Sequence, residues 1–479
     1  MEYTPREVME FVEQEDVKFI RLAFCNVYGK QHNVAIMPGE LPRAFAYGIA
    51  IDASAIEGFG GEVRSDLLLR PDPSTLIQLP WRPEQGKVVR MFCDIFYPDG
   101  RPFERDTRSI LKKAVSEAAE KGIEFAFGAE MEFYLFKLDE YGRPTTLPHD
   151  QAGYMDIAPD DKGEHIRREI CLMLEQMGIR PESSHHESGP GQNEIDFRYS
   201  DPLTAADNAI TFRAVVRTVA AQNGLCASFQ PKPLPDRDGS GMHINISAKG
   251  SGTEDLLPAV IAGVLAKSAE ITLFLNPSEE SYRRLGRDKA PRYITWSEEN
   301  RSQLIRIPAA IGENHRAELR SADATANPYL AYALLIHAGL LDKIAEITLF
   351  LNPSEESYRR LGCDKAPRYI TWSDENRSQL IRIPAAVGEQ RRAELRSADS
   401  TANPYLAYAL LIYAGLYGIS HKLALPPASD FNLYTAPAQI LQTLQALPDS
   451  LGEAIALAET SPFVRAHLPE SVLCAFGVK

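Results

Sequence analysis

Two glutamates inside an apolar, aromatic-rich segment constrain this chain more than any other feature of its sequence. Residues 125–136 read FAFGAEMEFYLF, with Gly122 before them and a turn-forming segment at 139–144 after them. This composition, bounded in this way, predicts a β-strand. Alternation along the strand would put Glu130 and Glu132 on one face, about 7 Å apart. Because close, desolvated carboxylates repel each other, that face is either open to water or supplied with arginine, lysine or metal cations.

A second pair of acids surrounds a turn further along the chain. Residues 183–197 read SSHHESGPGQNEIDF, so that Glu187 and Glu194 flank a Gly-Pro-Gly turn. Opposed positions of a hairpin would bring the two carboxylates to one point. The alternative is a polar loop with surface glutamates, in which His185 and His186 are supporting or surface groups.

A histidine follows the glycine-rich segment 239–241. In residues 242–247, His243, Asn245 and Ser247 alternate with apolar residues, which predicts a strand with one polar face. A lone histidine on a strand is usually structural. Three polar groups on one face favour the lining of a cleft, and an imidazole beside carboxylates is a suitable ligand for Mn²⁺ or Mg²⁺.

The remaining periodicity predicts a mixture of helices and strands with a domain boundary near residues 100–105. We expect helices over 4–15, 106–121, 165–177 and 205–223, and strands over 18–27, 31–36 and 87–97. The small, glycine-rich segment 48–61 predicts an ordered loop, in which Asp52 taken by itself would cap a turn.

Bulk properties exclude several classes of protein. A chain of 479 residues with 44% hydrophobic and 24% charged residues is ordinary for a globular protein of two or more domains. Its polar start and the lack of a long apolar run predict a cytoplasmic protein with no membrane partner. The net charge of −14 argues against a nucleic-acid partner. Six scattered cysteines without CxxC spacing indicate neither a disulfide framework nor a zinc site.

The second half of the chain contains a direct repeat. Residues 269–340 recur 76 positions later as 345–416, with seven substitutions. Two copies are too few for a solenoid. Each copy carries YRRLG, NRS, RIP and AELRS, which brings several arginines to a chain whose first half is rich in acids. Planar guanidinium groups recognise phosphate and carboxylate oxygens, so these arginines favour an anionic substrate.

Several motifs occur together in a characteristic order: GAEMEF at 128–133, the segment 187–194 with GQNE, GSGMH at 239–243, and the NRS, RIP and ANPYL motifs of each copy. In these motifs and their order, the chain resembles type I glutamine synthetases from its start to about residue 470. The resemblance implies an α+β fold. It comprises an N-terminal β-grasp domain (1–102) and a catalytic domain on a curved antiparallel sheet (103–479) that contains the duplicated block 267–342 and 343–418. It also implies a homo-oligomer, a dodecamer of two stacked hexameric rings with active sites between subunits.

The resemblance also implies residue roles. It assigns one Mg²⁺ or Mn²⁺ ion to Glu132, Glu187 and Glu194, and a second, which touches the nucleotide phosphates, to Glu130, His243 and Glu318 or its copy Glu394. It assigns glutamate to Gly239, Arg284 or Arg360, and Arg320 or Arg396. The transferred phosphate would be neutralised by Arg301 or Arg377, as catalytic groups, and by Arg306 or Arg382, as ATP-binding groups. Ser247 would lie near adenine, and Asp52 matches an aspartate that a neighbouring subunit lends to the ammonium site.

The implied activity is the ATP-dependent ligation of ammonia to the γ-carboxylate of glutamate through γ-glutamyl phosphate, which gives glutamine, ADP and phosphate. Two departures keep alternatives open. Lys289 and Lys365 stand where the family usually has a glutamate in the flap over the ammonium site, although Asp288 and Asp364 could substitute, so another amine could be the substrate. Family members carry the 76-residue block once, so one copy is surplus and an inactive or regulatory binding protein is the third possibility. We favour the first copy as the one that completes the site.

Overall fold

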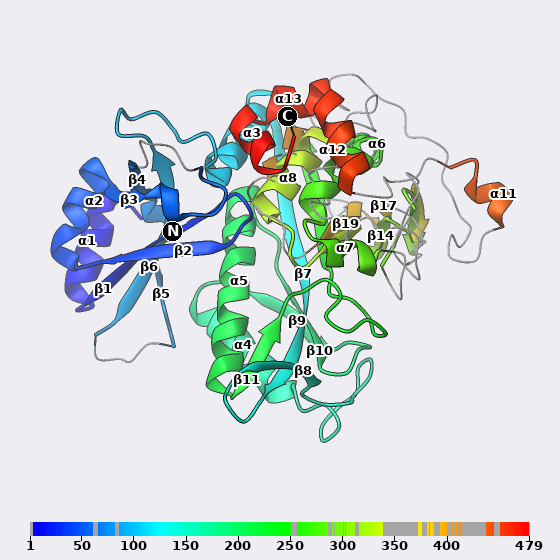
Figure 1. Cartoon of the computed structure of the whole chain (residues 1–479), viewed down its shortest axis with the longest axis horizontal. Helices are drawn as coiled ribbons and strands as arrows, with labels where there is room; N and C mark the ends of the chain where they lie inside the picture. The colour runs from blue at the N-terminus through cyan, green and yellow to red at the C-terminus, as the bar shows by residue number, and fades with distance from the viewer. Residues whose placement is uncertain are drawn as a thin grey trace.

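Two sheets and the helices around them make up the described part of the chain (Figure 1). The computed structural model describes residues 3–60, 66–81, 86–250, 256–285, 290–291, 293–299, 301, 303–311, 316–338, parts of 372–413, 437–444 and 451–478. The smaller sheet lies at the left of Figure 1, and helix α5 (Pro202–Gln222) stands between it and the long strand β7 (Ile123–Leu138) of the larger sheet. Among the described helices, none is long and apolar enough to cross a bilayer.

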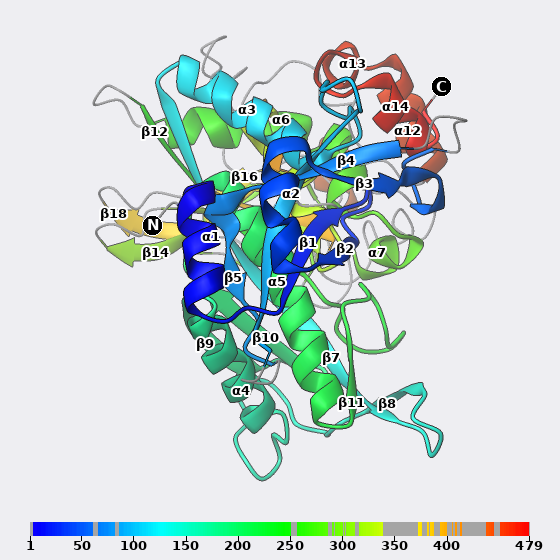
Figure 2. The same ribbon diagram turned by 90° about the vertical axis from the view of Figure 1, so that its left-hand side faces the viewer.

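The N-terminal sheet has two parallel central strands with antiparallel neighbours. Its order is β2-β1-β6-β4-β3, with β5 beside β6. The strands are β1 (Phe19–Cys25), β2 (Gln31–Ile36), β3 (Ile49–Asp52), β4 (Asp66–Pro71), β5 (Ile77–Gln78) and β6 (Val88–Phe96). Helices α1 (Pro5–Gln14) and α2 (Leu41–Tyr47) lie beside it, as the turned view of Figure 2 shows. The capping box between Thr4 and Glu7 fixes the start of α1, as the sequence predicts.

The interpretation of residues 48–61 as a loop is wrong at its beginning. Residues 49–52 form strand β3, which pairs antiparallel with β4 from Ile49 opposite Leu69 to Asp52 opposite Asp66. The pairing with β4 provides hydrogen-bond partners for the backbone groups of the strand. It also buries the Ile49 side chain, while the neighbouring Ala50 is exposed. Pairing with a segment 14 to 20 residues away outweighed the local preference of the small residues for a turn.

The larger sheet is built outward from β7. This strand lies between β12 (Met242–Gly250) and β10 (Gln192–Phe197), both antiparallel to it. Beyond β10 lies β9 (Pro181–His186), and β8 (Pro144–Pro148) and β11 (Leu225–Ser228) pair with the far end of β7. The other edge carries β13 (Trp296–Glu299), β14 (Ile305–Ile311), β15 (Ala317–Asp323), β16 (Trp372–Glu375), β17 (Ile381–Arg382), β18 (Pro384–Val387) and β19 (Ala393–Asp399). The α+β fold with a β-grasp domain and a curled, largely antiparallel catalytic sheet is confirmed.

Helices pack around the larger sheet and contribute to the core. They are α3 (Thr107–Glu120), α4 (Glu164–Gln176), α6 (Leu257–Leu275), α7 (Glu279–Arg284), α8 (Pro328–Ala338), α12 (Leu451–Thr460), α13 (Pro462–His467) and α14 (Glu470–Ala475). The short helix α11 (Ala438–Leu441) has no buried residue and stands apart at the right of Figure 1. The predicted helices at 106–121, 165–177 and 205–223 agree with α3, α4 and α5 to within a few residues. Residues such as Phe127, Phe133 and Val215 are fully buried and anchor the sheet against these helices.

The two repeat copies contribute neighbouring strands to the larger sheet. Strands β15 and β19 pair in parallel, with Leu319 opposite Leu395 and Arg320 opposite Arg396, which is the register of the sequence repeat. Equivalent residues of the two copies therefore lie side by side in the sheet.

A buried arginine joins the two sheets. Arg108 on α3 is 2% exposed, and its guanidinium group contacts Asp72, Asp94 and Asp207 at 2.8–3.0 Å. Asp72 and Asp94 come from the N-terminal sheet, and Asp207 comes from α5. Lys112 on the same helix also pairs with Asp72 and Asp94, so the N-terminal sheet meets α3 and α5 around two cations and three carboxylates.

We expect Arg108→Ala to lower the free energy of unfolding by about 3–5 kcal/mol, because it removes the guanidinium group that pairs with the buried carboxylate of Asp207. A urea titration followed by circular dichroism measures the change. Arg101→Ala is the matched control, since the Arg101–Asp99 pair is 73% and 53% exposed, and it should leave the unfolding midpoint almost unchanged. Equal midpoints for the two variants would contradict the structural role of Arg108.

Candidate active site

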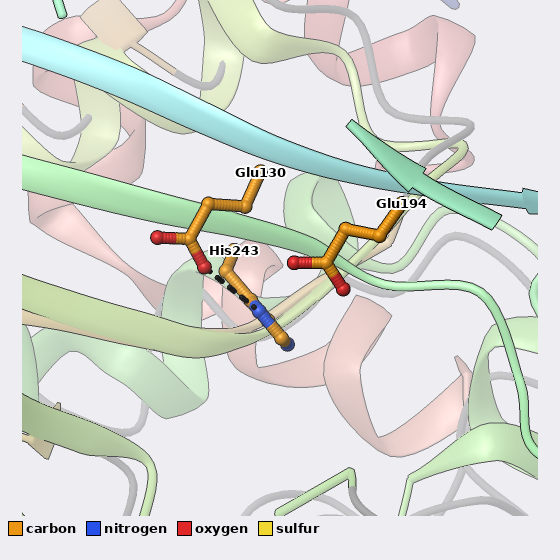
Figure 3. A group of neighbouring side chains, drawn as sticks. All are labelled: Glu130, Glu194 and His243. Carbon is orange, nitrogen blue, oxygen red and sulfur yellow. Dashed lines mark hydrogen bonds and ion pairs between the residues drawn. The ribbon is translucent and has the colours of Figure 1, made fainter. Parts of the chain in front are cut away.

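The register of three strands gathers the acids that the sequence singles out. On β7, Glu132 lies opposite Glu194 of β10, and Glu130 lies opposite both Asp196 of β10 and His243 of β12. Residues directly opposite each other in an antiparallel pair share a face. The predicted strand and hairpin thus bring their carboxylates to one surface of the sheet, and Figure 3 shows Glu130, Glu194 and His243 side by side on it.

Glu130 has both a cationic and a hydrogen-bond-donating partner on this surface. Its Oε2 lies 3.4 Å from His243 Nδ1, and its Oε1 accepts a hydrogen bond of 2.9 Å from the Asn245 amide. Burial opposes its charge, but the His243 ring, Arg316 and Asn245 outweigh that cost and lower the pKa of Glu130 to about 2. Glu130 is therefore a carboxylate over the whole physiological pH range.

Two groups of side chains on this surface have ligand atoms close enough to share a cation. Glu130, Glu194 and His243 form one group, and His185, Glu187 and Glu194 form the second, each with ligand atoms within 4.8 Å of one another. Glu194 belongs to both. Carboxylate oxygens with an imidazole nitrogen are a donor set that fits Mg²⁺ or Mn²⁺. His185, which the sequence left as a supporting or surface group, contacts Glu187 Oε1 at 3.1 Å.

The carboxylates of this surface repel one another, and a bound cation would relieve that repulsion. Burial, together with Asp196, Glu187 and Glu132, raises the pKa of Glu194 well above its usual range. The pKa of Asp196 rises to about 7 through burial and the nearby Glu130. Raised values of this kind arise where like charges share a desolvated site.

Glu132 faces a small cavity at the end of β12. Its Oε2 accepts hydrogen bonds from the Gly241 backbone at 2.8 Å and the Gln192 amide at 3.1 Å. Glu132, Glu187, Gly239, His243 and Arg284 are among the residues that line this cavity. A side chain at position 239 would collide with Pro231 and Arg284, so only glycine fits there. The predicted glutamate-binding residues Gly239 and Arg284 therefore lie beside the predicted metal ligands.

Arginines face the acids from the first repeat copy. Glu318 on β15 lies 3.6 Å from His243 Nδ1, 2.8 Å from Arg306 Nη1 and 3.2 Å from Arg320 Nε. Arg320 also donates to the carbonyl of Arg301, whose side chain is exposed. The structure thus brings Glu318, Arg306, Arg320 and His243 into one cluster. Arg301 lies at the solvent-exposed rim of this cluster.

A cavity of about 590 Å³ opens on the other side of Glu130. Its lining includes Glu130, Asn245, Ser247, Lys249 and Arg316. Sequence reasoning predicted Ser247 near the nucleotide but missed Arg316, whose Nε donates to Asn245 Oδ1 at 2.9 Å. The signal was available, because Arg316, Glu318 and Arg320 alternate in the sequence and so share one face of β15.

Asp52 is not part of this cluster in the single chain. It is exposed at the end of β3 on the N-terminal sheet, where its Oδ1 accepts from the Ser54 backbone at 2.9 Å and caps a short 3₁₀ turn. Glu394 is placed by its backbone opposite Asn245, Arg382 opposite Glu394, and Arg396 opposite Arg320. Arg360, Arg377, Asp288, Lys289, Asp364 and Lys365 lie outside the described residues.

Comparison with known proteins agrees with this geometry. The chain matches the family descriptions "Glutamine synthetase, beta-Grasp domain" over residues 16–98 and "Glutamine synthetase, catalytic domain" over 104–341 and 336–478. A glutamine synthetase of Methanosarcina mazei is 46% identical over 98% of this chain and 93% of its own length. One of Clostridium saccharobutylicum is 45% identical over 71% of this chain and 79% of its own length. The solved structure "GmaS/ADP complex-Conformation 1" has a TM-score of 0.73 at 24% identity, covering 98% of this chain and 93% of that one, and supports the fold.

The fold and the site define a two-domain ligase in which acids and histidines on a curled sheet, close enough together to hold divalent cations, lie opposite a group of arginines. The chain belongs to the glutamine synthetase family. It is an enzyme of ATP-dependent glutamine synthesis, and the family implies glutamate, ammonia and ATP as its substrates and a divalent metal as its cofactor.

The affinity for Mn²⁺ should rise with pH. A ligand must lose its proton before it binds a metal, and the raised pKa of Glu194 keeps that carboxyl protonated to higher pH than an exposed glutamate. We therefore expect proton release on Mn²⁺ binding, measured by calorimetry in buffers of different ionisation enthalpy between about pH 6 and pH 8. Glu194→Gln should release fewer protons. An affinity independent of pH would contradict the assignment of Glu194 as a ligand.

Proposed function

We propose that the face shared by β7, β10, β12 and β15 is where this chain joins ammonia to glutamate. The observation that supports it most is the pair of ligand groups that share Glu194, set beside the arginines of β14 and β15. In this proposal Glu132, Glu187 and Glu194 hold one cation, and Glu130, His243 and Glu318 hold another. Mg²⁺ or Mn²⁺, two or more per site, would supply positive charge to the phosphate oxygens of ATP.

The reaction needs an activated acyl group, because a free carboxylate is a poor acyl donor. Transfer of the terminal phosphoryl group of ATP to the γ-carboxylate of glutamate gives γ-glutamyl phosphate, and ammonia then displaces phosphate. Negative charge moves with the phosphoryl group, and fixed positive groups stabilise it as it moves. Arg306, whose Nη1 already pairs with Glu318, and Arg301 at the rim are the residues proposed for this task.

Substrates would bind on opposite sides of the metal ligands. We assign glutamate to the small cavity with Gly239 and Arg284 and to the neighbouring Arg320. The nucleotide fits the 590 Å³ cavity, with Ser247 near adenine and Arg316 near the phosphates. The γ-carboxylate of glutamate and the terminal phosphate of ATP would then meet beside Glu130 and His243.

Ammonium activation is proposed to need a second subunit. Asp52 is exposed on the N-terminal sheet, so its carboxylate is available to the site of a neighbouring chain, where it would take a proton from ammonium. We therefore propose a homo-oligomer, a dodecamer of two stacked rings with the sites between subunits. The free cysteines Cys25, Cys93, Cys171, Cys226 and Cys474 suit the reducing cytoplasm, which is the proposed location.

The proposed division of the chain is a β-grasp domain at 1–102 and a catalytic domain at 103–479, with the duplicated block at 267–342 and 343–418. The two copies have the same internal register, with Arg306 opposite Glu318 and Arg382 opposite Glu394. We propose that either copy can complete the active site while the other is displaced.

The activity is tested by phosphate release. We expect release only when ATP, glutamate, ammonium and Mg²⁺ or Mn²⁺ are all present, and Glu130→Gln should lower kcat by about 10²–10³ because it removes fixed charge at the reacting phosphate. Asn33→Ala, on the N-terminal sheet, is the control. Release that depends on a larger amine instead of ammonium would favour a γ-glutamyl ligase of different specificity, and no release with any amine would favour an inactive binding protein.

The proposal that either copy completes the active site is tested by disabling the copies one at a time. If either copy completes the site, Glu318→Ala and Glu394→Ala should each retain part of the activity, and the double variant should lose about 10²–10³ in kcat. Deletion of residues 267–342 should leave an active enzyme, because the remaining copy has the same register. Loss of activity in Glu318→Ala alone, with Glu394→Ala unchanged, would show that only the first copy serves the site.

A further inference from the structure

A buried polar network lies behind the hairpin of β9 and β10, in a part of the chain to which the sequence assigned no role. Asp150, Asp161, Arg167, His186 and Asn193 are each no more than 5% exposed. Asp150 and Asp161 come from the segment between β8 and α4, Arg167 lies on α4, and His186 and Asn193 directly precede Glu187 and Glu194. The two glutamates that belong to the second ligand group are thus each joined in sequence to a member of this network.

The network is not a further cation site, although the ligand atoms of Asp150, Asp161 and His186 lie within 4.8 Å of one another. Asp150 Oδ1 already accepts from His186 Nε2 at 3.0 Å and from the Gly191 backbone at 2.8 Å, and its Oδ2 accepts from the Lys162 backbone at 3.1 Å. Both oxygens of Asp161 are held by Arg167, at 3.2 and 2.5 Å. The positive charge that a metal would bring is already supplied by Arg167.

The first branch of the network fixes both arms of the turn between the glutamates. The His186 ring lies between Asp150 and the carbonyl oxygen of Glu187, which is 2.6 Å from its Nδ1. Because a neutral imidazole has a single N–H, the ring donates to both oxygens when it is protonated. The same Asp150 oxygen accepts from Gly191 on the other side of the turn. One carboxylate therefore ties the backbone of Glu187 to the strand that carries Glu194.

The second branch fixes the strand that carries Glu194. Arg167 Nη1 donates to Asn193 Oδ1 at 2.6 Å, and the Asn193 amide donates to the Gly191 carbonyl at 3.0 Å. A Cβ atom added at Gly163 would lie 2.7 Å from Asn193 Oδ1, so the helix start packs closely against this side chain. Movement of Glu194 away from Glu187 would break this bridge.

We propose that Asp150 and Arg167 are positioning residues that set the divalent-cation affinity of the Glu187 and Glu194 pair. This inference rests on the proposed metal role of those glutamates. A cation binds both carboxylates only if they are held together, and two buried carboxylates repel each other in its absence. The network opposes that repulsion because its hydrogen bonds hold the backbone on both sides of the turn between Glu187 and Glu194. Residues that orient metal ligands typically change metal affinity by about 10–100-fold when they are altered.

Asp150→Asn is the first test, because it keeps the side-chain shape and removes the charge that holds His186 and Gly191. We expect Mn²⁺ binding, followed by the electron paramagnetic resonance signal of the free ion, to weaken by about 10–100-fold. The Mn²⁺ concentration for half-maximal activity should rise by the same factor, and kcat at saturating Mn²⁺ should return close to that of the unaltered enzyme. Asp160→Asn, at an exposed position of the same segment, is the matched control and should bind Mn²⁺ normally.

Arg167→Lys is the second variant, since lysine keeps the charge but cannot bridge Asp161 and Asn193 with a planar fork. It should weaken Mn²⁺ binding in the same range, and it decides the question if Asp150→Asn does not fold. A folded variant of either kind with unchanged Mn²⁺ affinity would overturn the inference. Absence of Mn²⁺ binding in the unaltered enzyme would instead refute the metal role of Glu187 and Glu194, which separates failure of the proposed function from failure of this inference.

Discussion

Mutual repulsion among buried carboxylates is the constraint on which the rest of this structure depends. Glu130, Glu132, Glu194 and Asp196 occupy facing positions on two adjacent strands, where water cannot fully screen them. Their raised and lowered pKa values show the two ways in which the fold meets this cost, by protonation at Glu194 and by cationic partners at Glu130. A divalent cation, the cofactor that the glutamine synthetase family implies, would lower the same cost once Glu194 has lost its proton.

The remaining elements supply what those acids lack. Strand β12 brings His243 and Asn245, and the repeat copy that contains β14 and β15 brings Arg306, Arg316 and Arg320. The contact at Arg108 is built in the same way, with the Arg108 guanidinium group beside three carboxylates. A chain with a net charge of −14 can thus bind anionic substrates, because its cations are concentrated where the acids are densest.

Elements with strong local periodicity were predictable, and elements defined by distant pairing were not. The helices α3 and α5 and the strand β7 follow from patterns within a single segment, and their boundaries agree with prediction to within a few residues. Strand β3 was missed because it forms only against β4. In the site, Arg316 and His185 were missed or undervalued since their positions depend on the register of strands that are far apart in sequence. The buried network of Asp150 and Arg167 gave no sequence signal that separates it from an ordinary polar loop.

The sequence by itself determined the family, the acids and arginines that carry the chemistry, and the existence of two nearly identical copies, because motif order and repetition are properties of the chain alone. The tertiary structure decided that Glu194 belongs to two ligand groups, that Glu318 faces His243, and that equivalent strands of the two copies pair with each other. These facts depend on strand register. Register arises only when segments separated by tens or hundreds of residues pack against one another, since a carboxylate acquires its partners through space and not along the chain.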